Sequence, residues 1–210
     1  MPFSNNVRPE RMPGPISGNP ASGLCEKVCI QVTKVFDACI KQETMAQQTV
    51  TISDVTPTTA TPPYTFVSAR STTSKGTVSN VILTTLDPNT GATRIQMDVG
   101  VPIQVMFTDA TGQTAVGSTT LTVPRDIVLN IPQASVIPYR IEAVVNAVST
   151  VGSYVGDNTF NLTFCVTVIV KIVTDVELLV PSYGYCYIPP CQEFQQEVCE
   201  GFFDLPLFPQ

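Results

Sequence analysis

The chain has 210 residues and a mass of 22.6 kDa, a size that favours one β-rich domain with terminal extensions over two domains. Hydrophobic residues make up 43% of the chain and charged residues 13%, so it can fill a core but carries about half the charge of a typical soluble domain. It contains no histidine, which excludes imidazole-based nucleophilic, acid–base and zinc chemistry. The net charge of −6 favours neither nucleic acid nor anionic lipid as a partner.

The N-terminal residues 1–24 are dominated by Pro, Gly, Ser and Asn. Such a composition cannot bury enough apolar surface to fold alone, so we expect a flexible arm. It has no apolar region typical of a secretory signal, and we expect the chain to remain in the cell that makes it. The longest apolar stretch, 164–180, contains Lys171, Asp175 and Glu177, which favours a buried strand over membrane insertion.

Between residues 25 and 180 the sequence predicts a β-sandwich domain. Thr and Val supply roughly a quarter of the chain, and both suit pleated surfaces. The segments Asp87–Gly91 and Asp109–Gly112 predict hairpin turns. A helix over 137–148 is the competing interpretation of one segment, but Pro138 and the β-branched content favour a strand. The pattern therefore predicts an all-β, antiparallel sandwich of the Greek-key or jelly-roll type. The expected strands are 27–40, 48–55, 64–73, 76–86, 92–99, 101–109, 114–123, 126–131, 136–149 and 159–180.

The first of these strands has an apolar side and a side that carries thiols. If it is continuous, alternation predicts that its apolar side faces the core and that its other side faces outward. Lys34 falls on the apolar side and indicates that a bulge interrupts this register. The apolar side comprises Val28, Ile30, Val32, Phe36, Ala38 and Ile40, and the other side comprises Cys29, Gln31, Thr33, Asp37 and Cys39.

The chain has seven cysteines, an odd number that leaves one thiol over in any fully intramolecular pairing. Six of them lie near the two ends of the folded region, and we expect them to form disulfides between copies. Cys165 lies alone inside a predicted strand, and we expect it to be buried. An all-thiolate zinc site and unpaired reduced thiols are the alternatives, although no C-x2-C knuckle occurs. The six intermolecular candidates are Cys25, Cys29, Cys39, Cys186, Cys191 and Cys199.

The C-terminal residues 181–210 form a distinct acidic and aromatic tail. This segment has three cysteines, the acidic residues Glu193, Glu197, Glu200 and Asp204, and no Lys or Arg. Its apolar side chains are too many for a solvated tail, because exposed patches of this kind normally mark contacts. We expect the tail to dock on its own domain or on a neighbouring copy. The apolar docking residues are Phe194, Phe202, Phe203, Leu205, Leu207 and Phe208.

Two segments resemble a known group of proteins. VCIQVTKVFDACI at 28–40 and the tail GYCYIPPCQEFQQEVCEGFFDLPLFPQ are similar to Cys-containing spore-surface proteins of clostridia and related endospore formers. The resemblance implies a structural subunit of coat, exosporium or spore appendage that associates with copies of itself and with other spore-surface proteins. It also implies disulfide linkage on the spore surface, after synthesis in the mother cell and its lysis. No cofactor is implied.

No local motif of a catalytic site occurs in the sequence. The chain lacks the G-x-G-x-x-G, P-loop and G-x-S-x-G patterns, and its carboxylate pairs, such as Glu193 with Glu197, are expected to be solvated. We therefore expect no enzyme, no cofactor and no metal. A self-assembling structural subunit is the leading hypothesis, and a β-sandwich module for ligand binding or adhesion is the alternative.

Overall fold

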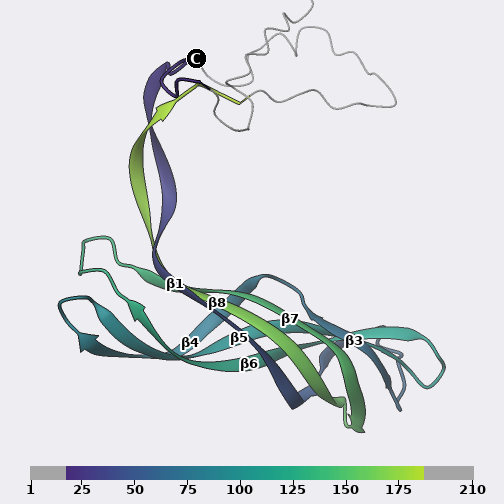
Figure 1. Cartoon of the computed structure of the whole chain (residues 1–210). Coiled ribbons are helices and arrows are strands. Elements are labelled where there is room, and N and C mark those ends of the chain that lie inside the picture. The colour runs from purple at the N-terminus through teal and green to yellow at the C-terminus, as the bar shows by residue number, and fades with distance from the viewer. Residues whose placement is uncertain (1–17, 187–210) are drawn as a thin grey trace, which may run out of the picture. The chain divides into compact units, whose positions relative to one another are not determined.

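The computed structural model describes residues 18–186, which fold entirely into β-strands and connecting segments (Figure 1). The predicted all-β, antiparallel class is confirmed. The competing helix over 137–148 is wrong, because a strand begins at Arg140. Within these residues, no helix of the length and apolar character needed to cross a membrane occurs. The strands are β1 (Glu26–Thr51), β2 (Ser53–Thr56), β3 (Thr65–Ser71), β4 (Lys75–Asp87), β5 (Ala92–Thr108), β6 (Thr114–Asn130), β7 (Arg140–Gly156) and β8 (Thr159–Ser182).

The chain divides into two compact units. One unit, the sandwich, comprises residues 33–176; the other comprises residues 1–32 and 177–210, of which the structure describes 18–32 and 177–186. Strands β1 and β8 contribute residues to both units. The sandwich is thus shorter at each end than the predicted span of 25–180. Most of the predicted arm and tail lies outside the described residues.

The sandwich has two layers joined through β3 and β4. The strand order is β1-β8-β7-β3-β5-β6-β2, with β4 pairing both β5 and β7. One layer contains β1, β8 and β7, and the other contains β4, β5, β6 and β2. The connection between the layers is made by short pairings of β3 and β4 with β7, at Ala69 with Ser149 and at Gly76 with Ala143.

Alternating side chains from both layers form one hydrophobic core. Odd-numbered residues of β5, from Ile95 to Phe107, are buried, and so are even-numbered residues of β8, from Phe160 to Ile172. The two sets belong to one cluster. The ring centroids of Phe107 and Phe160 are 5.5 Å apart, so the two layers pack face to face. This period-two burial explains why alternating apolar residues specify the strands.

Four predicted strands merge into two. β5 and β6 pair without interruption from Ala92 opposite Asn130 to Thr108 opposite Thr114, although the sequence predicted breaks near residues 100 and 124. Pro102 is tolerated inside β5 because it lies where pairing changes from β3 to β4, and its carbonyl still accepts the amide of Thr72 at 3.0 Å. A missing amide donor does little harm at such a junction.

The two predicted hairpin turns are confirmed. Gly91 adopts a φ of 75°, and the Asp87 carboxylate accepts hydrogen bonds from the Asn89 amide and the Thr90 hydroxyl. In the second turn the buried Asp109 carboxylate accepts the Thr111 hydroxyl, at 2.6 Å, and the backbone amides of Thr111 and Gln113. These hydrogen bonds lower the pKa of both aspartates. Side-chain capping of this kind is what favours Asp at turn starts.

The predicted face of β1 is wrong within the sandwich. Asp37 and Cys39 are half-buried, whereas Phe36 and Ile40 are 38% and 60% exposed. The reason lies on β6: the Asp37 carboxylate accepts the backbone and side-chain amides of Asn130, at 2.8 and 3.0 Å. Polar groups on β6 thus hold the polar side of β1 inward, and the apolar side faces out.

Candidate assembly surfaces

The first candidate surface is the described part of the smaller unit, residues 18–32 and 177–186. Here the ends of β1 and β8 pair, and the Cys25 backbone amide and thiol both approach the Ser182 carbonyl, at 3.0 and 3.4 Å. Leu178 and Leu179 are 45% and 68% exposed. A two-stranded ribbon buries too little surface to be stable by itself, so this unit offers apolar side chains to other segments.

Three of the predicted disulfide residues, Cys25, Cys29 and Cys186, are exposed free thiols of this unit. Cys25 and Cys29 are separated by roughly 13 Å along an extended strand, a distance that no single disulfide spans. A disulfide at either residue would therefore need a partner elsewhere. The remaining candidates Cys191 and Cys199 lie outside the described residues, as do the tail residues predicted to dock, Phe194, Phe202, Phe203, Leu205, Leu207 and Phe208.

The two cysteines of the sandwich differ from expectation. Cys165 is exposed, so the prediction of a buried thiol is wrong: the even-numbered residues of β8 fill the core, and Cys165 is on the opposite face. Cys39 is half-buried and packs against the core. Burial, and secondarily the charge of Asp37, raises the pKa of the Cys39 thiol. Of these two residues, Cys165 is therefore the better candidate for a bond to another copy.

The second candidate surface is the edge of β4, which the sequence analysis missed. Among the described strands, β7 pairs with β4 only at Lys75 and Gly76, and β5 pairs with its other side. Beyond Gly76 one edge of β4 is therefore open. Four aliphatic residues near this edge are exposed: Val81 (42%), Ile82 (60%), Leu83 (44%) and Leu86 (55%). The run of three consecutive aliphatic residues was the available signal, because a half-buried strand should alternate.

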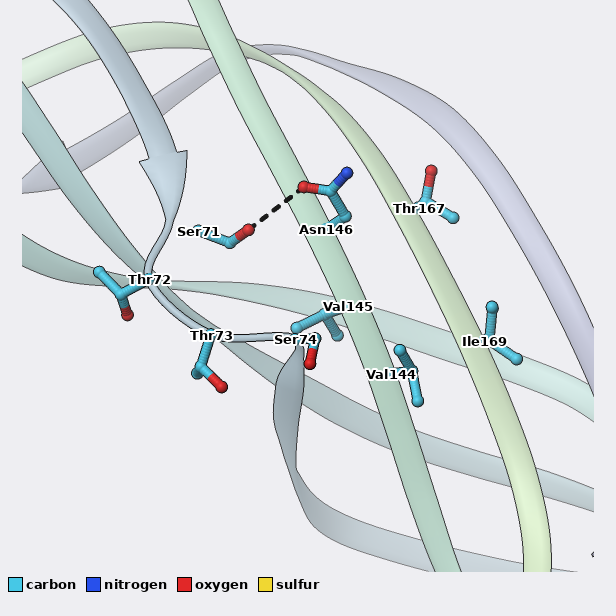
Figure 2. Close-up of a pocket in the computed structure, with 9 residues that line it drawn as sticks. All are labelled: Ser71, Thr72, Thr73, Ser74, Val144, Val145, Asn146, Thr167 and Ile169. Carbon is cyan, nitrogen blue, oxygen red and sulfur yellow. Dashed lines mark hydrogen bonds between the residues drawn. The ribbon is translucent and has the colours of Figure 1, made fainter. Parts of the chain in front are cut away.

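The third candidate surface is the outer face of the layer formed by β1, β8 and β7. Asn146 pairs with Thr167 and Val144 with Ile169 across β7 and β8, and Figure 2 shows these side chains beside one another on the two strands. Ser71 donates a hydrogen bond to Asn146 at 3.3 Å. Two shallow grooves meet here, since both include Asn146 and Thr167, and the second also includes Cys165.

Several charged groups of the sandwich are paired with one another. Arg140 binds Asp175 at 2.9 Å and Glu142 at 2.7 Å, and Arg94 binds Asp126. These contacts lower the pKa of Asp175 and of Asp126. Over residues 18–186, no group of three or more Cys, Asp or Glu side chains is placed to hold a metal ion. The arrangement offers surfaces for association and displays no recognisable catalytic constellation among the described residues.

Comparisons with known proteins give no relative of this chain: no family model, no curated protein and no solved structure matches it. The resemblance to spore-surface proteins therefore remains a hypothesis from the sequence.

Proposed function

We propose that this protein is a self-assembling structural subunit of a spore-surface polymer. Its copies join through open strand edges and terminal segments, and disulfides between copies lock the contacts. The observation that carries the proposal is the open aliphatic edge of β4, at Val81, Ile82, Leu83 and Leu86. The spore surface as location rests on the resemblance of residues 28–40 and of the tail.

An unprotected edge strand favours association. Monomeric proteins normally guard such edges with Lys, Pro or a covering loop, but no charged residue and no proline occurs between Thr77 and Leu86. Strand addition at this edge supplies main-chain hydrogen bonds and covers the aliphatic side chains. Full burial of an exposed aliphatic side chain contributes roughly 1.5–3 kcal/mol. Because these four are about half exposed, covering them adds about half of that for each.

A second open edge supports a polymer over a closed dimer. Among the described strands, β1 pairs only with β8, so its other edge is open as well. A contact between β4 of one copy and β1 of the next joins two different surfaces. Contacts of this heterologous kind repeat without closing unless their rotation forms a ring, which is the geometry of a fibre.

Exposed thiols can then make the contacts permanent. Cys25, Cys29 and Cys186 are free and exposed, and each disulfide between copies adds roughly 2–4 kcal/mol by restricting the separated state. Such bonds form in an oxidising environment such as that outside a cell. A spore surface exposed by lysis of the mother cell is such an environment.

The test compares Ile82→Lys with Ile137→Lys in the full chain, by electron microscopy and by non-reducing denaturing gels. The two isoleucines are matched in exposure, at 60% and 59%, but Ile137 lies outside the strands. We expect fibres from the wild type and the control and none from Ile82→Lys, with thermal melting unchanged. Wild-type protein that stays monomeric under oxidising conditions would contradict the proposal.

The grooves on the outer face of β7 and β8 favour a second candidate, a ligand-binding or adhesion module. Such a module binds its ligand as a monomer. Binding of the Ile82→Lys variant to immobilised glycans, together with no polymer from the wild type, would support this alternative. Polymers without glycan binding would support the structural subunit.

A further inference from the structure

The outer face of the β1–β8–β7 layer carries apolar side chains on all three strands. Gln42 donates a hydrogen bond to Thr167 on this face, at 3.3 Å, so alternation places Phe36, Ala38 and Ile40 of β1 on the same face. Ile40 and Val148 are 60% and 45% exposed. We call this surface the outer patch. It consists of Phe36, Ala38, Ile40, Val144, Val148, Cys165 and Ile169.

The orientation of β1 exposes apolar residues that could have faced the core. The inner side of the strand carries Asp37 and Glu43 together with Cys39 and Met45, which pack against the core, while Phe36 and Ile40 face out. Exposed contiguous apolar surface of this kind normally marks a contact. The same face has an exposed thiol, Cys165, and shallow grooves in which Asn146 and Thr167 offer hydrogen-bonding groups (Figure 2).

The charges around the outer patch favour an acidic occupant. The Lys34 ammonium lies 4.9 Å from the centroid of the Phe36 ring, and Lys171 is on β8 next to Ile169 in the outward-facing row. Arg140 binds both Glu142, which lies opposite Lys171, and Asp175, at 2.7 and 2.9 Å. The margin thus has three basic groups, Lys34, Arg140 and Lys171, against these two carboxylates. The face therefore has a small positive excess at its margin, and its apolar residues alternate with Asn146 and Thr167 toward the centre.

One segment of this chain has the complementary composition. Residues 187–210 contain four acidic residues and no basic residue, together with five phenylalanines and leucines in the last nine positions and the thiols Cys191 and Cys199. Fully extended, this segment spans roughly 75–80 Å, which is ample to cross three strands spaced about 4.8 Å apart. Its charge, apolar content and thiols match the outer patch in each respect.

We propose that the outer patch binds residues 187–210 of a second copy, and that Cys165 forms a disulfide with Cys191 or Cys199 of that segment. This inference rests on the proposed function, since assembly brings the second copy. In the covalent step the two thiols lose two protons and two electrons to a small-molecule disulfide. The bond between the two cysteine sulfurs forms as the disulfide of the oxidant breaks and leaves as two thiols.

The test mixes two full-length variants in the presence of oxidised glutathione. One is Cys191→Ser/Cys199→Ser, labelled with ¹⁵N, and the other is unlabelled Cys165→Ser. Neither can form the proposed bond alone. We expect mass spectrometry of non-reduced peptides to find a labelled Cys165 peptide joined to an unlabelled tail peptide.

A further pair of substitutions tests recognition by the outer patch. Introduced into the Cys191→Ser/Cys199→Ser variant, Ile40→Glu should lower the yield of the cross-linked peptide about tenfold, because it removes apolar contact and adds a like charge. Ile137→Glu, matched in exposure, should leave the yield unchanged. Equal yields for both substitutions would overturn the role of the patch.

The outcomes separate this inference from the proposed function. Polymers in which Cys165 stays free to alkylation would refute the inference and leave the proposed function intact. A bond between Cys165 and the tail that forms within single wild-type molecules, with none in the mixture, would also refute it. If the cross-link forms in the mixture but the wild type forms no polymer, the result would support the contact between tail and outer patch and contradict the proposed function.

Discussion

The ion pair between Arg125 and Glu43 yields a prediction about stability. The Arg125 side chain is 2% exposed and that of Glu43 27%. Arg125 donates from Nη1 to the Glu43 carboxylate at 2.5 Å and to the Pro124 carbonyl at 3.0 Å. Its buried Nε and Nη2 have no protein partner. One carboxylate therefore compensates most of a buried charge.

The substitution Glu43→Gln removes that compensation. Breaking a buried pair from one side costs about 3–5 kcal/mol, and the partial exposure of Glu43 favours the lower end, about 3 kcal/mol. Arg125→Met replaces the charge with an apolar side chain opposite Met97, and should be neutral or stabilising by about 1–2 kcal/mol. The remaining Glu43 keeps Lys41 as a partner at 3.0 Å. The double variant should lie close to the wild type.

Urea unfolding under reducing conditions measures these differences. For a slope of about 2 kcal/mol per molar urea, Glu43→Gln should unfold at a concentration about 1.5 M below the wild type. Equal changes in the free energy of unfolding for Glu43→Gln and Arg125→Met would refute the reasoning. Such a result would mean that Arg125 is solvated and does not depend on Glu43 as a partner.

The same pair predicts a dependence on pH. The hydrogen bond from Arg125 is the main cause that lowers the pKa of Glu43 below its ordinary value of 4.5. A carboxylate with a lowered pKa in the folded state stabilises the fold fully above its unfolded pKa and loses this effect as the pH falls through its folded pKa. The stability difference between wild type and Glu43→Gln should therefore shrink below about pH 4.5. A difference that is constant from pH 7 to pH 3 would contradict this assignment.

Two further predictions concern turns and thiols. Gly91→Ala should destabilise the fold by about 3 kcal/mol, because the added Cβ would lie 2.4 Å from the Ile131 carbonyl oxygen and the residue has a φ of 75°. Gly112→Ala should cost only about 1 kcal/mol, because Gly112 has a similar φ of 82° but lies in open space. Equal melting temperatures for the two variants would contradict this. In timed alkylation at pH 8 followed by mass spectrometry, Cys39 should react more slowly than Cys165, because its thiol is half-buried with a raised pKa. The two should react alike in urea, and equal rates in the native protein would refute the burial argument.

Local sequence features were sufficient for much of the fold. Alternating β-branched residues predicted the strands, and Asp87–Gly91 and Asp109–Gly112 predicted two hairpins, because the chemistry of each is complete within a few residues. The breaks predicted near residues 100 and 124 were wrong. Proline interrupts a strand only where a neighbouring strand needs its amide, and Pro102 lies where the neighbours change.

The candidate surfaces were less accessible to sequence reasoning. The thiols of the chain were visible at once, but the open edge of β4 exists only because β7 leaves it after Gly76. Cys165 is exposed because the even-numbered residues of β8 fill the core, so that its odd-numbered residues face away from it. An alternating strand has two faces, and pattern alone does not say which one a second layer will cover.

The sequence by itself therefore determined the all-β class, the two hairpin turns, and the thiols and apolar residues that the chain contains. Only the tertiary structure decided which of them face solvent. On β1 the choice was made by Arg125 and Asn130, which lie 82 and 93 residues away from their partners Glu43 and Asp37. Arg125, buried on a distant strand, requires a charged partner, and Glu43 on the inner side of β1 supplies it. The contact of Asp37 with the exposed Asn130 holds the same side of β1 toward β6, so the side that carries Phe36 and Ile40 faces out.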